Sequence, residues 1–227
     1  MALGDAERRH ARVLRLERGA DVELFDGRGG VWGGTVAEVT RDGLDVRVGA
    51  RRPAMAAESP LEVTVVQGLC RGARMDEVVR HATELGVSCF VPVRFHRSTR
   101  RDGNLDRWRA IARDAARQCG RGVVPGVEEI CAFDEFLSRA SAGLRLLLHP
   151  PGEGISPLGA LAAGEIRAVS VVVGPEGGLE DAEVRAALDR GIRAVSLGPR
   201  ILRTETAGLA AVAALQAQYG DLGVSGS

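Results

Sequence analysis

The sequence predicts an α/β protein, a parallel sheet covered by helices on both faces, with a small β-rich module in front of it. Three observations lead to this prediction. Short strand-like segments separated by glycine turns occupy the first 57 residues. From residue 61 onward, valine- and leucine-rich runs alternate with segments of helical period, the pattern of α/β sheets. Two of the apolar runs lead directly into glycine-containing loops, where ligands bind in such sheets.

Residues 1–57 are predicted to form the β-rich module. Three strands are expected, over residues 21–25, 31–39 and 44–48. Two glycine-containing turns separate them, at residues 27–30 and 42–43. A short helix is expected before the strands, over residues 7–16. The segment 51–60 holds two prolines and small side chains, which is typical of a linker.

Residues 61–221 are predicted to form the α/β domain. Its strands are expected over residues 61–69, 89–93, 144–148, 169–173 and 194–197. Its helices are expected over residues 74–85, 105–119, 181–188 and 204–219. In the second helix Trp108, Ala112 and Ala115 fall on one face, the spacing of an amphipathic helix. The strand from residue 89 is expected to close at Pro92, and residues 222–227 are expected to form a flexible tail.

Composition excludes several classes of protein. With 45% hydrophobic and 26% charged residues the chain is ordinary for a globular protein, and its apolar runs fall short of a membrane span of about 20 residues. The first ten residues lack the apolar segment of a secretory signal, so we expect a cytoplasmic protein without membrane contact. Its four cysteines include no Cys-x-x-Cys pair and its four histidines no i, i+4 pair, so we expect no metal site.

Charge is unevenly distributed although the net charge is zero. Residues 71–121 hold twelve arginines against six acids, whereas residues 122–227 hold eight arginines against thirteen acids. Lysine is absent, so arginine or histidine must serve every cationic role. A basic middle segment in a neutral protein suits an anionic partner such as RNA.

Two loops stand where a parallel sheet binds ligands. Gly174-Pro-Glu-Gly-Gly178 follows one apolar strand, and Gly198-Pro-Arg200 follows another. A phosphate cradle would combine glycines with a basic residue, but here Glu176 lies in the loop and the next helix opens with three more acids. Those acids interact favourably with the positive end of the helix dipole and would repel a polyphosphate. A nucleoside with a positive centre, such as the sulfonium S-adenosylmethionine, is compatible with these loops.

Several segments, in this order and spacing, resemble those of a known family. The two most specific are Gly174-Pro-Glu-Gly-Gly178 and Leu197-Gly-Pro-Arg-Ile-Leu-Arg-Thr-Glu-Thr-Ala207. Others are Val13-Leu-Arg-Leu16, Leu24-Phe-Asp-Gly27, Thr83-Glu-Leu-Gly-Val87, Gln118-Cys-Gly-Arg121 and Leu148-His-Pro150. From about Arg9 to Asp221 the chain thus resembles the RsmE family of bacterial 16S ribosomal RNA uridine-N3 methyltransferases.

The resemblance implies a fold and a reaction. Residues 1–57 would form a PUA-like β-barrel that binds RNA, and residues 61–221 a SPOUT methyltransferase domain whose C-terminal chain threads a trefoil knot. Only about ten residues precede the Val13 segment, so the barrel is expected to be incomplete or closed differently. The implied cofactor is S-adenosylmethionine, the implied substrate is ribosomal RNA or the small ribosomal subunit, and the implied assembly is a homodimer.

The resemblance and the loop positions together give candidate site residues. Those expected at the cofactor are Leu148, His149, Pro150, Gly174, Glu176, Gly177, Leu197, Gly198, Ile201, Leu202, Arg203 and Ala207. Uridine N3 carries a proton, so Glu205 or a group beside the cofactor is expected to assist its removal, while Arg203 stabilises charge on the base. Contacts to RNA phosphates are expected from Arg15, Arg71, Arg74, Arg97 and Arg121.

Alternatives remain for the catalytic pair and for the function. Arg203 and Glu205 are equally compatible with an ordinary ion pair at the start of the last helix. A related knotted methyltransferase would act on transfer RNA or on a ribose hydroxyl. A protein of another class, a non-catalytic RNA-binding assembly factor, would bind RNA through the first module and would have no working cofactor site.

Overall fold

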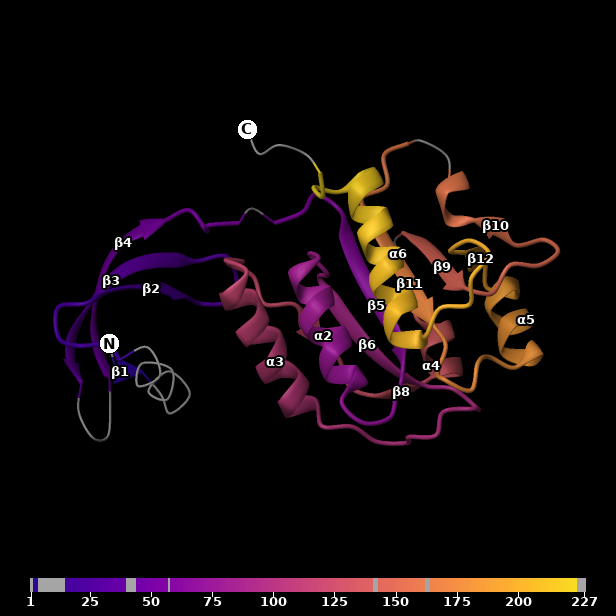
Figure 1. Cartoon of the computed structure of the whole chain (residues 1–227), viewed down its shortest axis with the longest axis horizontal. Helices are drawn as coiled ribbons and strands as arrows, with labels where there is room; N and C mark the ends of the chain where they lie inside the picture. The colour runs from indigo at the N-terminus through magenta and orange to yellow at the C-terminus, as the bar shows by residue number, and fades with distance from the viewer. Residues whose placement is uncertain are drawn as a thin grey trace. The chain divides into compact units, whose positions relative to one another are not determined.

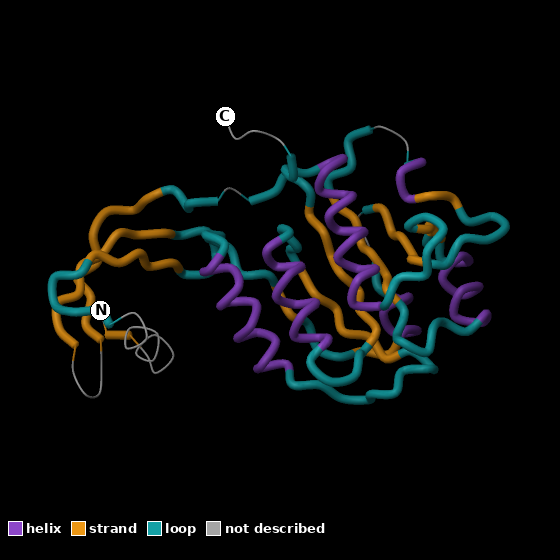
Figure 2. Tube along the Cα trace, in the orientation of Figure 1, coloured by secondary structure: helices purple, strands orange, loops and turns teal. Residues whose placement is uncertain are grey.

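The chain folds into two compact units. The computed structural model describes residues 2–3, 15–39, 44–56, 58–140, 143–161 and 164–223 (Figures 1 and 2). One unit comprises Met1–Ala57 with Gly120–Val123, and the other Glu58–Cys119 with Val124–Ser227. Most of the helix expected over residues 7–16, the turn at 42–43 and residues 224–227 of the expected tail lie outside the described residues.

The first unit is an antiparallel sheet. Its strands, in spatial order, are β1 (Ala2–Leu3), β4 (Leu44–Arg52), β3 (Val31–Val39) and β2 (Asp21–Phe25). Val36, Leu44 and Val46 form its small buried core. Strand β4 runs beyond the expected 44–48 because Arg51 and Arg52 still pair with β3. Among the described residues these pairings give an open four-stranded sheet, so a closed barrel is not formed by them.

A loop from the middle of the sequence completes the first unit, which the sequence did not predict. Within the predicted turn at 27–30, Gly29 has a φ of 94°, and its backbone N–H donates to the carbonyl oxygen of Gly122 at 3.0 Å. Isolated bridges add Arg28 to Val123 and Ala56 to Arg121. The turn itself is held by Asp26, whose carboxylate accepts the backbone N–H groups of Arg28 and Gly30 at 2.7 and 2.9 Å.

The second unit contains a sheet in which every pairing is parallel. Its strands, in spatial order, are β10 (Ser156–Pro157), β12 (Arg193–Ser196), β9 (Leu144–Leu148), β11 (Ala168–Val173), β5 (Glu62–Gly68), β6 (Cys89–Arg94) and β7 (Gly126–Val127), with β8 (Cys131–Ala132) also paired to β6. Strand β6 ends one residue beyond the expected 89–93, and Pro92, which we expected to close it, lies inside it. Pro92 lacks an N–H and lies between the part of β6 paired with β7 and the part paired with β8, so no ladder bond is lost there.

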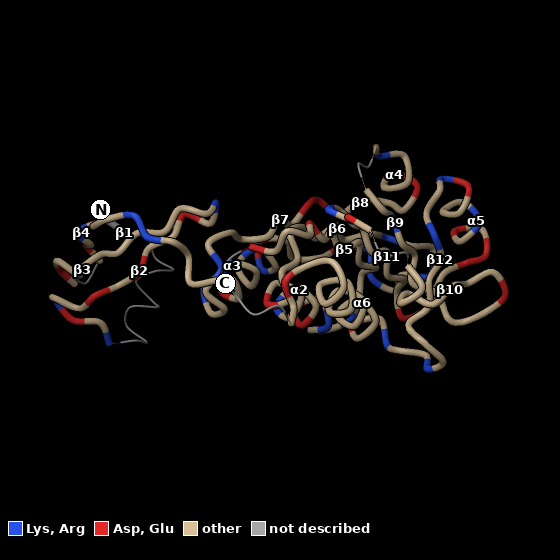
Figure 3. Tube along the Cα trace, turned by 90° about the horizontal axis from the view of Figure 1, so that it is seen from above, with Lys and Arg blue, Asp and Glu red and all other residues tan. Residues whose placement is uncertain are grey.

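Helices cover both faces of this sheet, as predicted. The helices α2 (Arg74–Glu84), α3 (Leu105–Gln118) and α6 (Thr204–Tyr219) lie on one side, and α4 (Phe133–Ser138) and α5 (Asp181–Asp189) on the other (Figure 3). Successive side chains of β5 point to opposite faces of the sheet. Val65 packs in the core under α2, and Val66 packs in the core under α4. Among the described helices, none has the length and apolar character that crossing a membrane requires.

The strand order brings distant loops to one edge of the sheet. Because β12, β9, β11 and β5 are adjacent and parallel, their carboxyl ends lie side by side. The loops that begin at His149, Gly174 and Leu197 therefore emerge together, beside the turn after Gly68. This strand order is consistent with the trefoil knot, whose threading stays a prediction.

Candidate functional site

The loops at this edge enclose a cavity of about 870 Å³. Such a volume lies within the range of about 300–1,000 Å³ that is common for small-molecule sites. All the residues predicted at the cofactor line it, together with Glu205, with Arg71 from the turn after β5 and with Arg74 at the start of α2. The two glycine-containing loops thus meet in one cavity, which is the arrangement that the sequence predicted.

Other lining residues were not predicted. They are Thr99, Pro151, Val173, Pro175, Gly178, Leu179, Arg200 and Thr204. Pro175, Gly178, Arg200 and Thr204 belong to the two segments that carry the family resemblance, which was a signal for them. Pro151, Val173 and Leu179 adjoin residues of these or other predicted segments, so their only signal was position in the chain. Thr99 comes from the loop after β6 and carried no signal, since nothing in the sequence shows that this loop reaches the cavity.

Three glycines shape the cavity and the loops around it. A Cβ at Gly68 would lie 2.6 Å from the backbone nitrogen of Pro175, so glycine lets the loop after β11 rest directly on the end of β5. A Cβ at Gly177 would lie 2.9 Å from the carbonyl oxygen of Arg97. The small size of Gly177 is therefore already required by its contact with the loop after β6. Gly198 has a φ of 96°, in the region that glycine favours.

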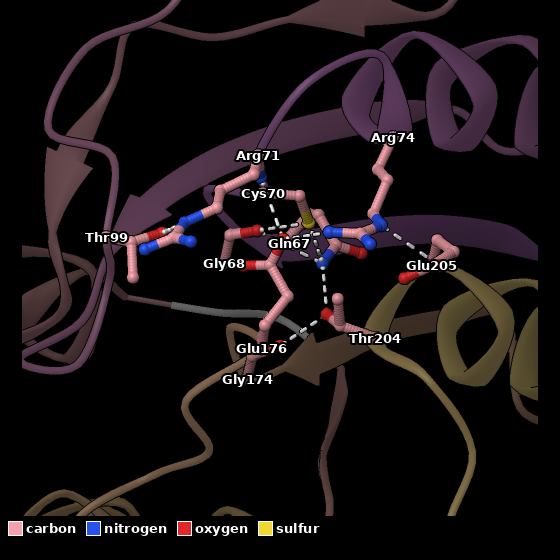
Figure 4. Close-up of polar contacts among 10 residues, drawn as sticks. All are labelled: Gln67, Gly68, Cys70, Arg71, Arg74, Thr99, Gly174, Glu176, Thr204 and Glu205. Atoms are coloured by element: carbon pink, nitrogen blue, oxygen red, sulfur yellow. Dashed lines mark hydrogen bonds and ion pairs between the residues drawn. The ribbon is translucent and has the colours of Figure 1, made fainter.

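Arg74 joins two carboxylates across the cavity (Figure 4). Its Nη1 lies 2.8 Å from Oε1 of Glu176, and its Nε lies 3.2 Å from Oε1 of Glu205. Among the described residues Arg203 forms no ion pair, so the pairing of Arg203 with Glu205 that we left open is not what the structure has. Because its guanidinium is occupied by two carboxylates, Arg74 is better placed to organise the cavity than to meet an RNA phosphate.

Glu176 is held as a carboxylate. Burial raises its pKa, but the backbone N–H of Arg71, at 2.8 Å, and the guanidinium of Arg74 outweigh burial, and the net pKa is lowered. The hydrogen bond to Glu176 in turn raises the pKa of Arg74. Nearby, burial and then the negative charge of Glu176 raise the pKa of the Cys70 thiol to about 12, so Cys70 stays neutral.

Replacing Glu176 by glutamine is expected to change stability in a pH-dependent way. The folded-state pKa of Glu176 lies below its usual value of 4.5, so its ionised form stabilises the fold above that pH. The contribution, about 1 kcal/mol at pH 7, is lost as the pH falls through the lowered pKa. Urea unfolding of both proteins between pH 3 and 7 measures it. A difference between them that stays constant over this range would contradict the assignment.

The remaining predicted RNA contacts lie in different surroundings. Arg15 and Arg97 are exposed, and Nε of Arg97 lies 3.6 Å from Glu180 at the start of α5. Glu180 also forms a capping box with Glu183, so the acids of this helix stabilise its N-terminus, as expected. Arg121 is buried, with 7% relative exposure, which is typical of a structural arginine rather than of a phosphate contact.

No metal ligand cluster accompanies the cavity in the described part of the chain. There, no group of three or more histidine, cysteine, aspartate and glutamate side chains is arranged to hold a metal ion. The cysteines at positions 70, 89, 119 and 131 are free thiols.

Comparison with known proteins covers both units of the chain. Residues 57–216 match the family model of an RNA methyltransferase domain, and residues 3–49 match that of an RNA methyltransferase PUA domain. Ribosomal RNA small subunit methyltransferase E of Mycobacterium bovis is 34% identical over 93% of this chain and 84% of its own length.

Two solved structures are similar to the chain over nearly its whole length. One is ribosomal RNA small subunit methyltransferase E of Neisseria gonorrhoeae bound to S-adenosylmethionine, with 34% identity, a TM-score of 0.90, and coverage of 97% of this chain and 92% of that one. The other is a putative methyltransferase of Legionella pneumophila in complex with the same cofactor, with 32% identity, a TM-score of 0.91, and coverage of 98% and 93%. With a PUA domain followed by an RNA methyltransferase domain, this chain belongs to the ribosomal RNA small subunit methyltransferase E family.

Proposed function

We propose that this enzyme transfers a methyl group from S-adenosylmethionine to N3 of a uridine in 16S ribosomal RNA. One observation carries the proposal. The residues expected at the cofactor come from three separate stretches of sequence, and they line a single cavity at the carboxyl ends of β9, β11 and β12. Relatives with the same fold were solved with S-adenosylmethionine.

The residues of the cavity suit this cofactor. Leu148, Leu197 and Leu202 supply an apolar wall for an adenine ring. The carboxylate of Glu176 lies on the cavity and favours a positively charged sulfonium. When bound, S-adenosylmethionine supplies an electrophilic methyl group to the acceptor nitrogen.

Two side chains at the start of α6 are assigned to the uridine. The carboxylate of Glu205 has 15% exposure and accepts the proton that leaves N3. Arg203 is exposed at the cavity, and its guanidinium donates to the carbonyl oxygens on which negative charge develops. The largest contribution of the protein is orientation, because holding two reactants in line lowers a barrier by up to about 7–11 kcal/mol.

The proposal extends to partners and location. The PUA-like unit and the exposed Arg71 contact the ribosomal RNA, either free or in the small subunit. The enzyme acts in the cytoplasm as a homodimer, and its C-terminal chain is knotted. Light scattering of the purified protein measures the oligomeric state directly.

Methyl transfer to ribosomal RNA from cells that lack the enzyme tests the function. Naked 16S RNA and assembled small subunits are incubated with labelled S-adenosylmethionine, and the digested nucleosides are identified by mass spectrometry. We expect 3-methyluridine in at least one of the two substrates. Label in transfer RNA or on ribose would identify a different methyltransferase activity. A protein that gives no heat of binding with S-adenosylmethionine would instead be a non-catalytic RNA-binding factor.

A further inference from the structure

A buried glutamine lies directly behind the cavity. Gln67, near the end of β5, has 1% relative exposure and does not line the cavity itself. Its Nε2 donates to Oγ1 of Thr204 at 2.9 Å and to the carbonyl oxygen of Gly68 at 3.2 Å (Figure 4). The Thr204 hydroxyl in turn donates to the carbonyl oxygen of Gly174. A chain of hydrogen bonds therefore runs from β5 through the start of α6 to the loop after β11.

This chain has only one possible direction. The carbonyl oxygens of Gly68 and Gly174 can only accept. The amide nitrogen of Gln67 must therefore face Gly68, and the hydroxyl proton of Thr204 must point to Gly174. Thr204 then has no proton left for Gln67 and accepts from it. A fixed direction matters because Thr204 and Gly174 both line the cavity, so the chain sets how these two groups are presented there.

Keeping glutamine at this position costs stability. Its other amide atom, Oε1, is buried without a hydrogen-bond partner, a penalty that leucine would avoid. A buried oxygen left without a partner, where an apolar side chain would leave none, is typical of a functional requirement rather than of core packing.

We infer that Gln67 is a positioning residue of the cofactor cavity, acting through the Thr204 hydroxyl on the Gly174 carbonyl group. The inference rests on the proposed function, because the ligand whose affinity reports it is S-adenosylmethionine. Gln67 does not touch the ligand. It fixes the loop after β11 against the first turn of α6, the two segments that carry Glu176 and Glu205.

Affinity for S-adenosylmethionine, measured by calorimetry, tests the inference. Gln67→Leu and Thr204→Val are each expected to raise Kd about tenfold, because either change breaks the hydrogen-bond chain. Thr204→Ser keeps the hydroxyl and is expected to stay within about twofold of the wild type. The double variant Gln67→Leu with Thr204→Val should bind no more weakly than Thr204→Val alone, since both changes interrupt one chain. Should Gln67→Leu not fold, the two Thr204 variants decide.

Gln216, another buried glutamine, lies on α6 with Thr204 and offers a matched control. It is fully buried, its Oε1 accepts from Oγ of Ser59 at 2.6 Å, and its Nε2 donates to the carbonyl oxygen of Gly86 at 3.3 Å. It does not line the cavity. Gln216→Leu is therefore expected to lower the melting temperature while leaving Kd within about twofold.

The outcomes separate the inference from the function. If the wild type binds S-adenosylmethionine and Gln67→Leu and Thr204→Val bind it equally well, the inference is wrong and the function stands. A Kd raised as much by Gln216→Leu as by Gln67→Leu would also overturn it, because the effect would then be general loosening. A wild type without any affinity for the cofactor would remove the proposed function, and the inference with it.

Discussion

Replacing Arg203 by alanine is expected to lower kcat for methyl transfer about 10²–10³-fold, the range seen when one donor to a developing negative charge is removed. Arg203 lines the cavity, is exposed, and forms no ion pair with a described residue. Its guanidinium is therefore free to meet the uracil carbonyl oxygens. Single-turnover transfer to 16S RNA, at saturating cofactor, measures the change.

An arginine at the other end of the preceding strand provides the control. Arg193 begins β12, is exposed, and does not line the cavity, so Arg193→Ala is expected to leave kcat unchanged. It matches the loss of charge in Arg203→Ala without touching the site. Near-native kcat in Arg203→Ala would show that this side chain does not act on the base.

The companion change, Glu205→Gln, tests the base. Glutamine keeps the shape of the side chain but cannot take up a proton, so kcat is expected to fall about 10²–10⁴-fold. The affinity for S-adenosylmethionine is the internal reference and is expected to stay unchanged, because Glu205 takes its proton from the RNA and not from the cofactor. If Glu205→Gln turns over normally, a group beside the cofactor removes the proton instead.

The long elements were predictable because they repeat a pattern several times. Helix α3 shows the helical period over 14 residues, and β11 is a valine-rich run broken only by Ser170. Strands β7, β8 and β10 have two residues each, too few to show any period. Their pairing depends on neighbours supplied by the rest of the fold. The same holds for Gly120–Val123, which joins the first unit through backbone contacts that carry no side-chain signal.

The cavity was predictable, but its ion pairs were not. Glycines after apolar strands indicate where backbone meets ligand, and parallel strands bring such loops together. The partners of Arg74, however, lie in the loop after β11 and in the first turn of α6, more than one hundred residues along the chain. Which carboxylates Arg74 meets depends on the order of strands in the sheet. Sequence spacing alone left a local ion pair of Arg203 and Glu205 open as an alternative.

Replacing Arg74 by methionine is expected to lower kcat/KM for methyl transfer up to about 100-fold, because small displacements of catalytic groups carry costs of that order. Arg74 is the cation that Glu176 and Glu205 share. Without it the two carboxylates repel each other, and Glu205 loses the group that orients it. Affinity for RNA, measured as a function of salt, is expected to keep its slope, since the guanidinium of Arg74 is occupied by two carboxylates rather than by a phosphate.

Arg71 is the matched control, because it lies in the turn that directly precedes Arg74 at the start of α2. Its contact with Glu176 comes from the backbone N–H, which Arg71→Met retains, while its side chain reaches only Thr99 among the described residues. Arg71→Met is therefore expected to preserve cofactor affinity and to reduce the slope of RNA affinity against salt by about 1. If instead Arg74→Met shows the shallower slope with normal catalysis, Arg74 contacts the RNA and the cavity does not depend on its bridge.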